Sequence, residues 1–348
     1  GIIKTSRVFK HPRMVQFQRM SMDQNNTSLK PPNLIKSFKE GFDAIANHIG
    51  LLLFPLGLDL FLWLGPHWRI SRLIEQMLQT MAQVSGGGQT DLLRLGQEFW
   101  KTAAERINIF ALLRTYPVGI FSLMAGVQPV DTPFGKPIEF QVDSIFILFL
   151  AWIILTLVGI ACGTIFFSAV AQAALEGKLN WLELITSWFT RFIQVALLSM
   201  FWVTIIALIS MPSSCLISVF ALSNVSISQF AILIILGLLV WLLFPLLLSP
   251  HGIFYKKENV WKSIKQSVRI TRFTFPTTTL LFLMVIVINQ GLDIVWRLPK
   301  ETSWFMVIGI AGHGFITSGL LAATFVYYRD AIAWVDGMLE KIKIASIS

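Results

Sequence analysis

The stretch VDSIFILFLAWIILTLVGIACGTIFFSA, residues Val142–Ala169, determines the class of this chain because it is long, apolar and almost free of charge. A helix needs about 20 apolar residues to cross about 30 Å of hydrocarbon, so this stretch is long enough to span a membrane. Five further stretches share this character, at Ile49–Gly65, Phe192–Ser210, Phe230–Ser249, Thr277–Trp296 and Trp304–Tyr328. The sequence therefore predicts an all-α, polytopic membrane helix bundle with about six transmembrane helices.

The composition agrees with a membrane protein. Hydrophobic residues make up 55% of the 348 residues and charged residues only 14%, well below the ~25% of a soluble domain. We expect a single membrane domain over residues 34–343, after a basic, flexible N-terminal tail over 1–33 and before a short tail over 344–348. The first residues, up to Met22, are either the upstream sequence of a fragment or a basic cytoplasmic tail.

Basic residues beside the apolar stretches predict the orientation of the chain. Lys36 and Lys39 precede the first stretch, whereas the loop Met211–Gln229 has no charge. Six more basic residues separate the fourth and fifth stretches: Lys256, Lys257, Lys262, Lys265, Arg269 and Arg272. Cytoplasmic loops carry an excess of Lys and Arg, so both termini should face the cytoplasm, with residues 66–141, 211–229 and 297–303 outside. The net charge of +9 then reflects membrane orientation, and we predict no nucleic-acid partner.

A short amphipathic helix precedes three of the stretches. These helices begin near Ile35, Trp181 and Trp261, and the second and third align at an offset of 80 residues. A helix that is apolar on one face and basic on the other lies in the headgroup plane of a membrane. The pattern predicts three repeated units, each made of an interfacial helix and a helical hairpin. The alternative is that amphipathic segments merely lead into the spans of any polytopic protein.

The segment 66–141 is predicted to form an extramembrane helical cap. Two amphipathic helices are expected there, separated by SGGG at Ser85–Gly88, with Thr90 as the N-cap of the second. The cap either packs over the bundle or acts as a lid over an outward-facing cavity. The apolar run Ile107–Gly126 contains Arg114 and Pro117, so we interpret it as a lid or a re-entrant segment and not as a seventh span.

Five polar residues form a candidate intramembrane cluster, because ionisable groups at membrane depth are functional hypotheses by default. They are Asp59, Arg114, Asn289, Asp293 and His313. The topology places them toward the outer leaflet, where they could converge on one cavity. We predict specifically that Asp59 pairs with Arg114, since a lone buried carboxylate is unfavourable.

Structural roles are open for the same residues. Asp293 could pair with Arg297, four residues further along the chain, and His313 could simply bond a neighbouring helix. His251 is interpreted as an interfacial residue at the cytoplasmic rim. No zinc spacing, phosphate-binding loop or nucleophile elbow occurs in the sequence, so we predict no catalytic residue, cofactor or metal.

Three phrases resemble a known family. They are AQAALEGK (Ala171–Lys178), NVWKSIKQSVRITRF (Asn259–Phe273) and AATFVYYRDAIAWVDG (Ala322–Gly337). Together they resemble the bacterial polytopic family that forms the membrane domain of glycerophosphoryl diester phosphodiesterases and that also occurs alone in uncharacterised proteins. The resemblance covers roughly residues 149–337 and implies no known activity. No segment of this chain outside the spans could hold the soluble phosphodiesterase barrel, which needs ~250 residues.

The sequence does not identify a substrate. The first interpretation is a non-enzymatic accessory or scaffolding protein of a bacterial inner membrane, with membrane lipids and other membrane proteins as its partners. The alternatives are a small-solute transporter or channel and an intramembrane lipid-processing enzyme. A cavity reaching the middle of the membrane would favour transport, a closed bundle would favour the accessory role, and two carboxylates beside a lipid-accessible groove would favour an enzyme.

Overall fold

The computed structural model describes residues 31–84, 91–223 and 225–345. Predictions for residues 1–30, for the SGGG break and Thr90, and for the last three residues lie outside this part of the chain. The described residues are almost entirely helical, which confirms the all-α class. The described chain also contains irregular loops and two short parallel strands, β1 (His67–Arg69) and β2 (Glu139–Gln141), in which His67 lies opposite Glu139.

Five helical segments of the described chain are long and apolar enough to cross a membrane, and a bent pair makes six. The five involve α7 (Ile145–Glu176), α8 (Trp181–Ser223), α9 (Val225–Leu243) with α10 (Ser249–Tyr255), α12 (Phe275–Trp296) and α13 (Met306–Ala345). The bent pair joins α2 (Leu34–Asn47) at 88° to residues 49–64, which form a 3-10 turn (Ile49–Leu52) and α3 (Leu53–Leu64). A multi-pass membrane protein follows from this count.

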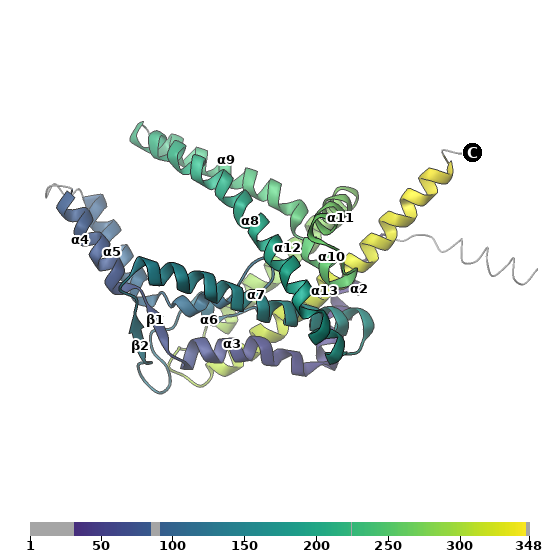
Figure 1. Cartoon of the computed structure of the whole chain (residues 1–348), viewed down its shortest axis with the longest axis horizontal. Coiled ribbons are helices and arrows are strands. Elements are labelled where there is room, and N and C mark those ends of the chain that lie inside the picture. The colour runs from purple at the N-terminus through teal and green to yellow at the C-terminus, as the bar shows by residue number, and fades with distance from the viewer. Residues whose placement is uncertain (1–30, 85–90, 224, 346–348) are drawn as a thin grey trace, which may run out of the picture.

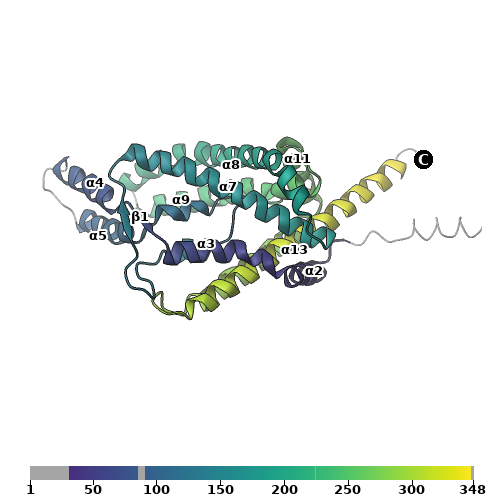
Figure 2. The ribbon, with the colours of Figure 1, turned by 60° about the horizontal axis from the view of Figure 1, so that its bottom comes forward.

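The two ends of the bundle carry different elements. Figure 2 shows α13 crossing α3 and α7 obliquely, and α8 and α9 lie against each other as a hairpin. One end carries the strands and the hairpin of α4 (Ser71–Val84) and α5 (Asp91–Arg106). The other end carries α2, α11 (Val260–Phe273) and the last turns of α13. The hairpin of α4 and α5 projects from its end of the molecule, so it does not lie across the bundle as the predicted cap would (Figure 1).

Helix α2 packs tightly on α13, the last helix of the chain. Its buried residues are Ser37, Gly41 and Ile45, whereas Ile35 at the predicted apolar stripe is exposed. A Cβ on Gly41 would lie 2.6 Å from Cα and 2.9 Å from Cβ of Ala323, so only glycine allows the two backbones to approach this closely. The first and last helices of the described chain are therefore direct neighbours.

The three predicted repeat units differ in the structure. Only Thr274 separates α11 from α12, and α2 is separated from the following span by its sharp bend. The segment that begins at Trp181, by contrast, is the first part of one continuous helix, α8. The second unit therefore has no separate amphipathic helix.

The predicted loop Met211–Gln229 is wrong, because both α8 and α9 continue through it. The segment has no charge that would hold it in water, and Pro212 is accommodated inside α8. Ser214 and Ser218 donate hydrogen bonds to the carbonyls of Met211 and Ser214, each at 2.8 Å. Serine hydroxyls of this kind reduce the penalty of an interrupted helix in an apolar environment.

Candidate intramembrane cavity

A non-helical segment enters the bundle between α3 and α7. It begins with a 3-10 helix (Ile109–Leu113), and Ile109 packs with Val142 and Ala151 near the start of α7. Further along, Val118 is fully buried in the same cluster as Phe166 and Phe167. The chain then returns to α6 (Met124–Val127), where Leu123 and Met124 pack in one cluster with Leu62 and Trp63. The segment thus runs into the bundle and returns, and we call it the re-entrant segment.

Glycines on α7 allow this irregular backbone to lie against the helix. A Cβ on Gly163 would lie 2.6 Å from Cα of Gly119, and a Cβ on Gly159 would lie 2.7 Å from Cγ2 of Thr115. Irregular backbone within a membrane is tolerated only where protein buries it or where it lines a cavity. Residues Thr115–Gly119 meet this condition because α7 covers one side of them.

Asp59 holds the returning part of the re-entrant segment. Its carboxylate is fully buried and accepts hydrogen bonds from Ser122 Oγ (2.5 Å) and from the backbone N–H groups of Leu123 (3.1 Å) and Met124 (2.9 Å). These donors lie at the start of α6, where backbone N–H groups have no partner within the helix. The predicted ion pair between Asp59 and Arg114 is wrong, since backbone and hydroxyl donors satisfy the carboxylate instead.

Arg114 also contacts Ser122, but on its other side. Its Nη1 donates to the backbone carbonyl of Ser122 at 3.2 Å, and its guanidinium lies 5.4 Å from the centre of the Tyr116 ring. The Nε of Arg114 is buried and has no hydrogen-bond partner. Ser122 therefore links Asp59 and Arg114 without a direct contact between the two charges.

Asp293 and His313 form a buried pair next to this cluster. Nδ1 of His313 lies 2.8 Å from Oδ1 of Asp293, and Nη2 of Arg297 lies 3.7 Å from Oδ2 of the same carboxylate. The predicted structural pairing of Asp293 with Arg297 is thus confirmed. His313 also lies close enough to Asp59 to interact with it electrostatically. Asp59 thus lies near the pair of Asp293 and His313, but none of these three residues lines the cavities described below.

A cavity of about 370 Å³ lies between the re-entrant segment and the middle turns of α12 and α13. We call it the mid-bundle cavity. Helices α7, α8 and α10 also contribute to its wall. Its lining residues include Arg114, Tyr116, Trp202, His251, Phe282, Asn289, Gln290, Thr317 and Thr324. Four of these residues carry a buried nitrogen or oxygen without a hydrogen-bond partner: Arg114 Nε, Trp202 Nε1, His251 Nδ1 and Asn289 Oδ1.

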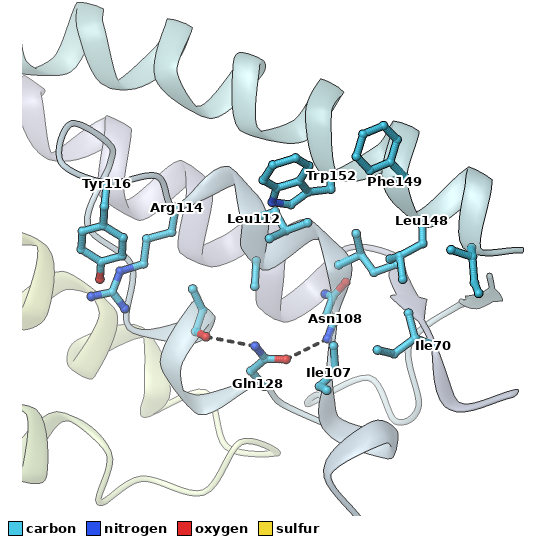
Figure 3. A pocket seen from close by; sticks show the side chains of 14 residues that line it. Ile70, Ile107, Asn108, Leu112, Arg114, Tyr116, Gln128, Leu148, Phe149 and Trp152 are labelled. Atoms are coloured by element: carbon cyan, nitrogen blue, oxygen red, sulfur yellow. Dashed lines mark hydrogen bonds between the residues drawn. The ribbon is translucent and has the colours of Figure 1, made fainter. Parts of the chain in front are cut away.

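A second cavity, the outer groove, begins where the mid-bundle cavity ends. It has a volume of about 680 Å³ and shares Arg114 and Tyr116 with the mid-bundle cavity. Figure 3 shows these two side chains together at one end of the groove, with Ile70 and Leu148 toward the other. Between them the wall is mostly apolar, and Gln128 is fixed by hydrogen bonds to the N–H of Asn108 and the carbonyl of Ala125.

The structure divides the five predicted site residues into two groups. Arg114 and Asn289 line the mid-bundle cavity, whereas Asp59, Asp293 and His313 form the polar cluster beside it. His251 was interpreted as interfacial, which is wrong, because it is buried and its Nε2 lies 2.8 Å from the hydroxyl of Thr324. Ser122 and Trp202 were not predicted at all, since a serine or a tryptophan in an apolar run has no distinctive sequence signal.

No protein-family model matches the chain, and neither a curated protein nor a solved structure was found to be similar to it. The arguments for function therefore come from the geometry of the two cavities and of the polar cluster.

Proposed function

We propose that this multi-pass membrane protein is a carrier for a small solute, which it binds in the mid-bundle cavity. The observation behind this proposal is the re-entrant segment itself. Transporters commonly place their binding sites at interrupted backbone near the middle of the membrane. Residues 114–117 provide such backbone, and Arg114, Tyr116 and Pro117 line the cavity directly.

The unpaired polar atoms of the cavity wall support a ligand site. Leaving a buried donor or acceptor without a partner costs about 1–3 kcal/mol. The wall concentrates four such atoms, on Arg114, Trp202, His251 and Asn289. A polar solute or water in the cavity could satisfy them, whereas a bundle that serves only as a scaffold has no need for them.

An accessory role is the second candidate, and the hairpin of α8 and α9 favours it. Figure 1 shows this hairpin diverging from the rest of the bundle. It exposes large apolar side chains along its length, among them Met211, Phe230 and Trp241. Lipid or a second membrane protein would cover this surface. The lipid-processing interpretation is not proposed, because neither Asp59 nor Asp293 lines the outer groove.

The proposal includes a bacterial inner membrane with both termini in the cytoplasm. Helix α11 carries Lys262, Lys265 and Arg269 at the same end of the bundle as α2, which supports this orientation and interfacial positions for both helices. A cysteine replacing Lys300 should react with an impermeant reagent added to intact cells, and one replacing Lys265 should not. The opposite result would reverse the orientation.

Membership in the membrane-domain family of glycerophosphoryl diester phosphodiesterases is also part of the proposal. Support comes from the order of a separate amphipathic helix, α11, followed by the spans α12 and α13. Helix α11 contains the second of the three phrases and α13 contains the third.

Access of water to the mid-bundle cavity tests the carrier function. Both native cysteines, Cys162 and Cys215, are exposed and would first be replaced by serine. Asn289→Cys would then be exposed to a charged, membrane-impermeant thiol reagent in right-side-out and in inside-out vesicles. Val287→Cys is the matched control, because it lies two residues away on an exposed face of α12.

A carrier should show labelling of Asn289→Cys from both sides and no labelling of Val287→Cys, which lipid surrounds. If Asn289→Cys stays unlabelled from both sides while the variant folds normally, the cavity is closed to water. The accessory role would then be preferred.

A further inference from the structure

Arg114 is a cation at the junction of the two cavities. It lines both the mid-bundle cavity and the outer groove. The ion pairs among the described residues include Arg69, Arg191, Arg297 and Arg329 but not Arg114. Its guanidinium has only the carbonyl of Ser122 and the ring of Tyr116 as partners. Arg114 is partly exposed, but its Nε is buried without a hydrogen-bond partner, so an anion that approaches the guanidinium would satisfy it.

Arg297 reaches the same place from the end of α12. A Cβ on Gly126 would lie 2.9 Å from Nη2 of Arg297 and 3.9 Å from Nη1 of Arg114. The two guanidinium groups therefore converge over the backbone of α6, and the absence of a side chain at Gly126 leaves room for both. A guanidinium group binds a carboxylate or a phosphate through paired hydrogen bonds. Two guanidinium groups close together therefore favour the binding of such an anion.

Arg297 also lines a third pocket, which faces the end of the bundle that carries α4 and α5. This pocket has a volume of about 430 Å³, and its wall includes Arg106 and Lys300 as well as one carboxylate, Glu301. Cations thus follow one another from the pocket to Arg297, then to Arg114, and then to the mid-bundle cavity. A row of like charges along a low-dielectric path raises the local concentration of the opposite charge.

Of the nearby carboxylates, Asp293 partly balances Arg297, but neither Asp293 nor Asp59 forms an ion pair with Arg114 among the described residues. Asp59 is fully buried beneath three donors, and it lines none of the three cavities. Asp293 is shared between Arg297 and His313 and also lines none of them. The lining residues of the three cavities thus include four cations, Arg106, Arg114, Arg297 and Lys300, and one carboxylate, Glu301, while Asp293 outside the cavities partly balances Arg297.

We propose that the solute is an anion whose carboxylate or phosphate group is bound by Arg114 after passing Arg297. This inference rests on the proposed carrier function and adds the charge class of the solute. The same oxyanion chemistry could come from a dissolved anion or from the headgroup of an anionic lipid, since the apolar outer groove beside Arg114 could hold an acyl chain.

The experiment compares two thiol reagents of similar size and opposite charge. Purified Asn289→Cys protein, without its native cysteines, is placed in phosphatidylcholine vesicles. It then reacts with an anionic sulfonatoethyl methanethiosulfonate or a cationic trimethylammonioethyl methanethiosulfonate. Each rate is divided by the rate of the same reagent with 2-mercaptoethanol. The anionic reagent should be preferred, and Arg114→Gln should reduce the preference by at least about tenfold, because removing a unit charge a few ångströms away changes the rates of the two reagents in opposite directions.

Arg114→Lys is the matched control, because it keeps the charge and should keep most of the preference. If Arg114→Gln does not fold, Lys300→Gln in the exposed third pocket replaces it and should produce a smaller reduction in the same direction. Equal relative rates, a preference for the cationic reagent, or a preference that neither Gln variant changes would overturn the anion proposal. Reaction with neither reagent would instead refute the carrier function.

Two further arms identify the source of the anion. Inorganic phosphate added to the phosphatidylcholine vesicles should slow the reaction if the protein binds a dissolved anion. Phosphatidylglycerol in the vesicles, without added phosphate, should slow it if a lipid headgroup occupies the site. If neither phosphate nor phosphatidylglycerol slows the reaction of Asn289→Cys, and the two reagents react at equal relative rates, the site does not bind oxyanions.

Discussion

Replacing Asp59 should detach the returning part of the re-entrant segment from α3. Its carboxylate accepts three hydrogen bonds, from Ser122 Oγ and from the N–H groups of Leu123 and Met124. A buried donor without an acceptor costs about 1–3 kcal/mol, so the loss of all three hydrogen bonds in Asp59→Ala should reduce the free energy of unfolding by at least about 3 kcal/mol. Asp59→Asn keeps one acceptor oxygen, so its free energy of unfolding should fall by only about 1–3 kcal/mol.

A double-mutant cycle distinguishes this arrangement from an ion pair with Arg114. Equilibrium unfolding in mixed detergent micelles would be measured for Asp59→Asn, Ser122→Ala, Arg114→Gln and the two double variants. The coupling of Asp59 with Ser122 should be about 1.5–3 kcal/mol, the range for a hydrogen bond to a charged group. The coupling of Asp59 with Arg114 should be clearly smaller, because the two side chains meet only through Ser122. A larger coupling with Arg114 than with Ser122 would refute this reasoning.

Three further predictions concern other parts of the fold. Gly41→Ala should destabilise the protein measurably in a thermal unfolding assay, because its Cβ would meet Ala323, whereas Gly50→Ala should be nearly neutral, because nothing lies within 4 Å of the added atom. Tyr327→Phe should cost about 1–2 kcal/mol of unfolding free energy in mixed micelles, since the hydroxyl bonds Thr277 and Thr278 at 3.0 and 2.8 Å, and an unchanged midpoint would contradict these bonds. Burial, and then the neighbouring Arg69 guanidinium, lower the pKa of His67 below its usual 6.5, so the unfolded chain takes up a proton first as pH falls. The free energy of unfolding should therefore decrease below about pH 6.5. Unfolding curves measured at different pH should show a weaker decrease for His67→Gln.

The sequence predicted the spans well because apolar length depends on residues that are adjacent in the chain. Stretches such as Val142–Ala169 and Thr277–Trp296 correspond closely to α7 and α12. It failed at Met211–Gln229, where the absence of charge was taken for a loop although it equally allows a helix to continue. Helix ends inside an apolar environment have no polar signal in the sequence, so their positions are set by packing.

The candidate site was predicted only in part because its contacts join distant residues. Asp293 and Arg297 are four residues apart on one helix, and their pairing was foreseen. Asp59 and Ser122 are far apart in the chain, and charge complementarity pointed to Arg114 instead. Backbone N–H groups exist at almost every residue, so no sequence pattern could show that those of Leu123 and Met124 would satisfy Asp59.

The contact between α2 and α13 has a consequence for the order of assembly. Helix α2 is synthesised first among the described elements, and the helix that covers its Gly41 face is synthesised last. Helix α2 therefore stays incompletely buried until α13 has been synthesised, because contacts between distant parts of a chain form late. Premature termination before α13 would leave the face of Ser37, Gly41 and Ile45 uncovered. A quality-control protease could recognise such truncated chains there.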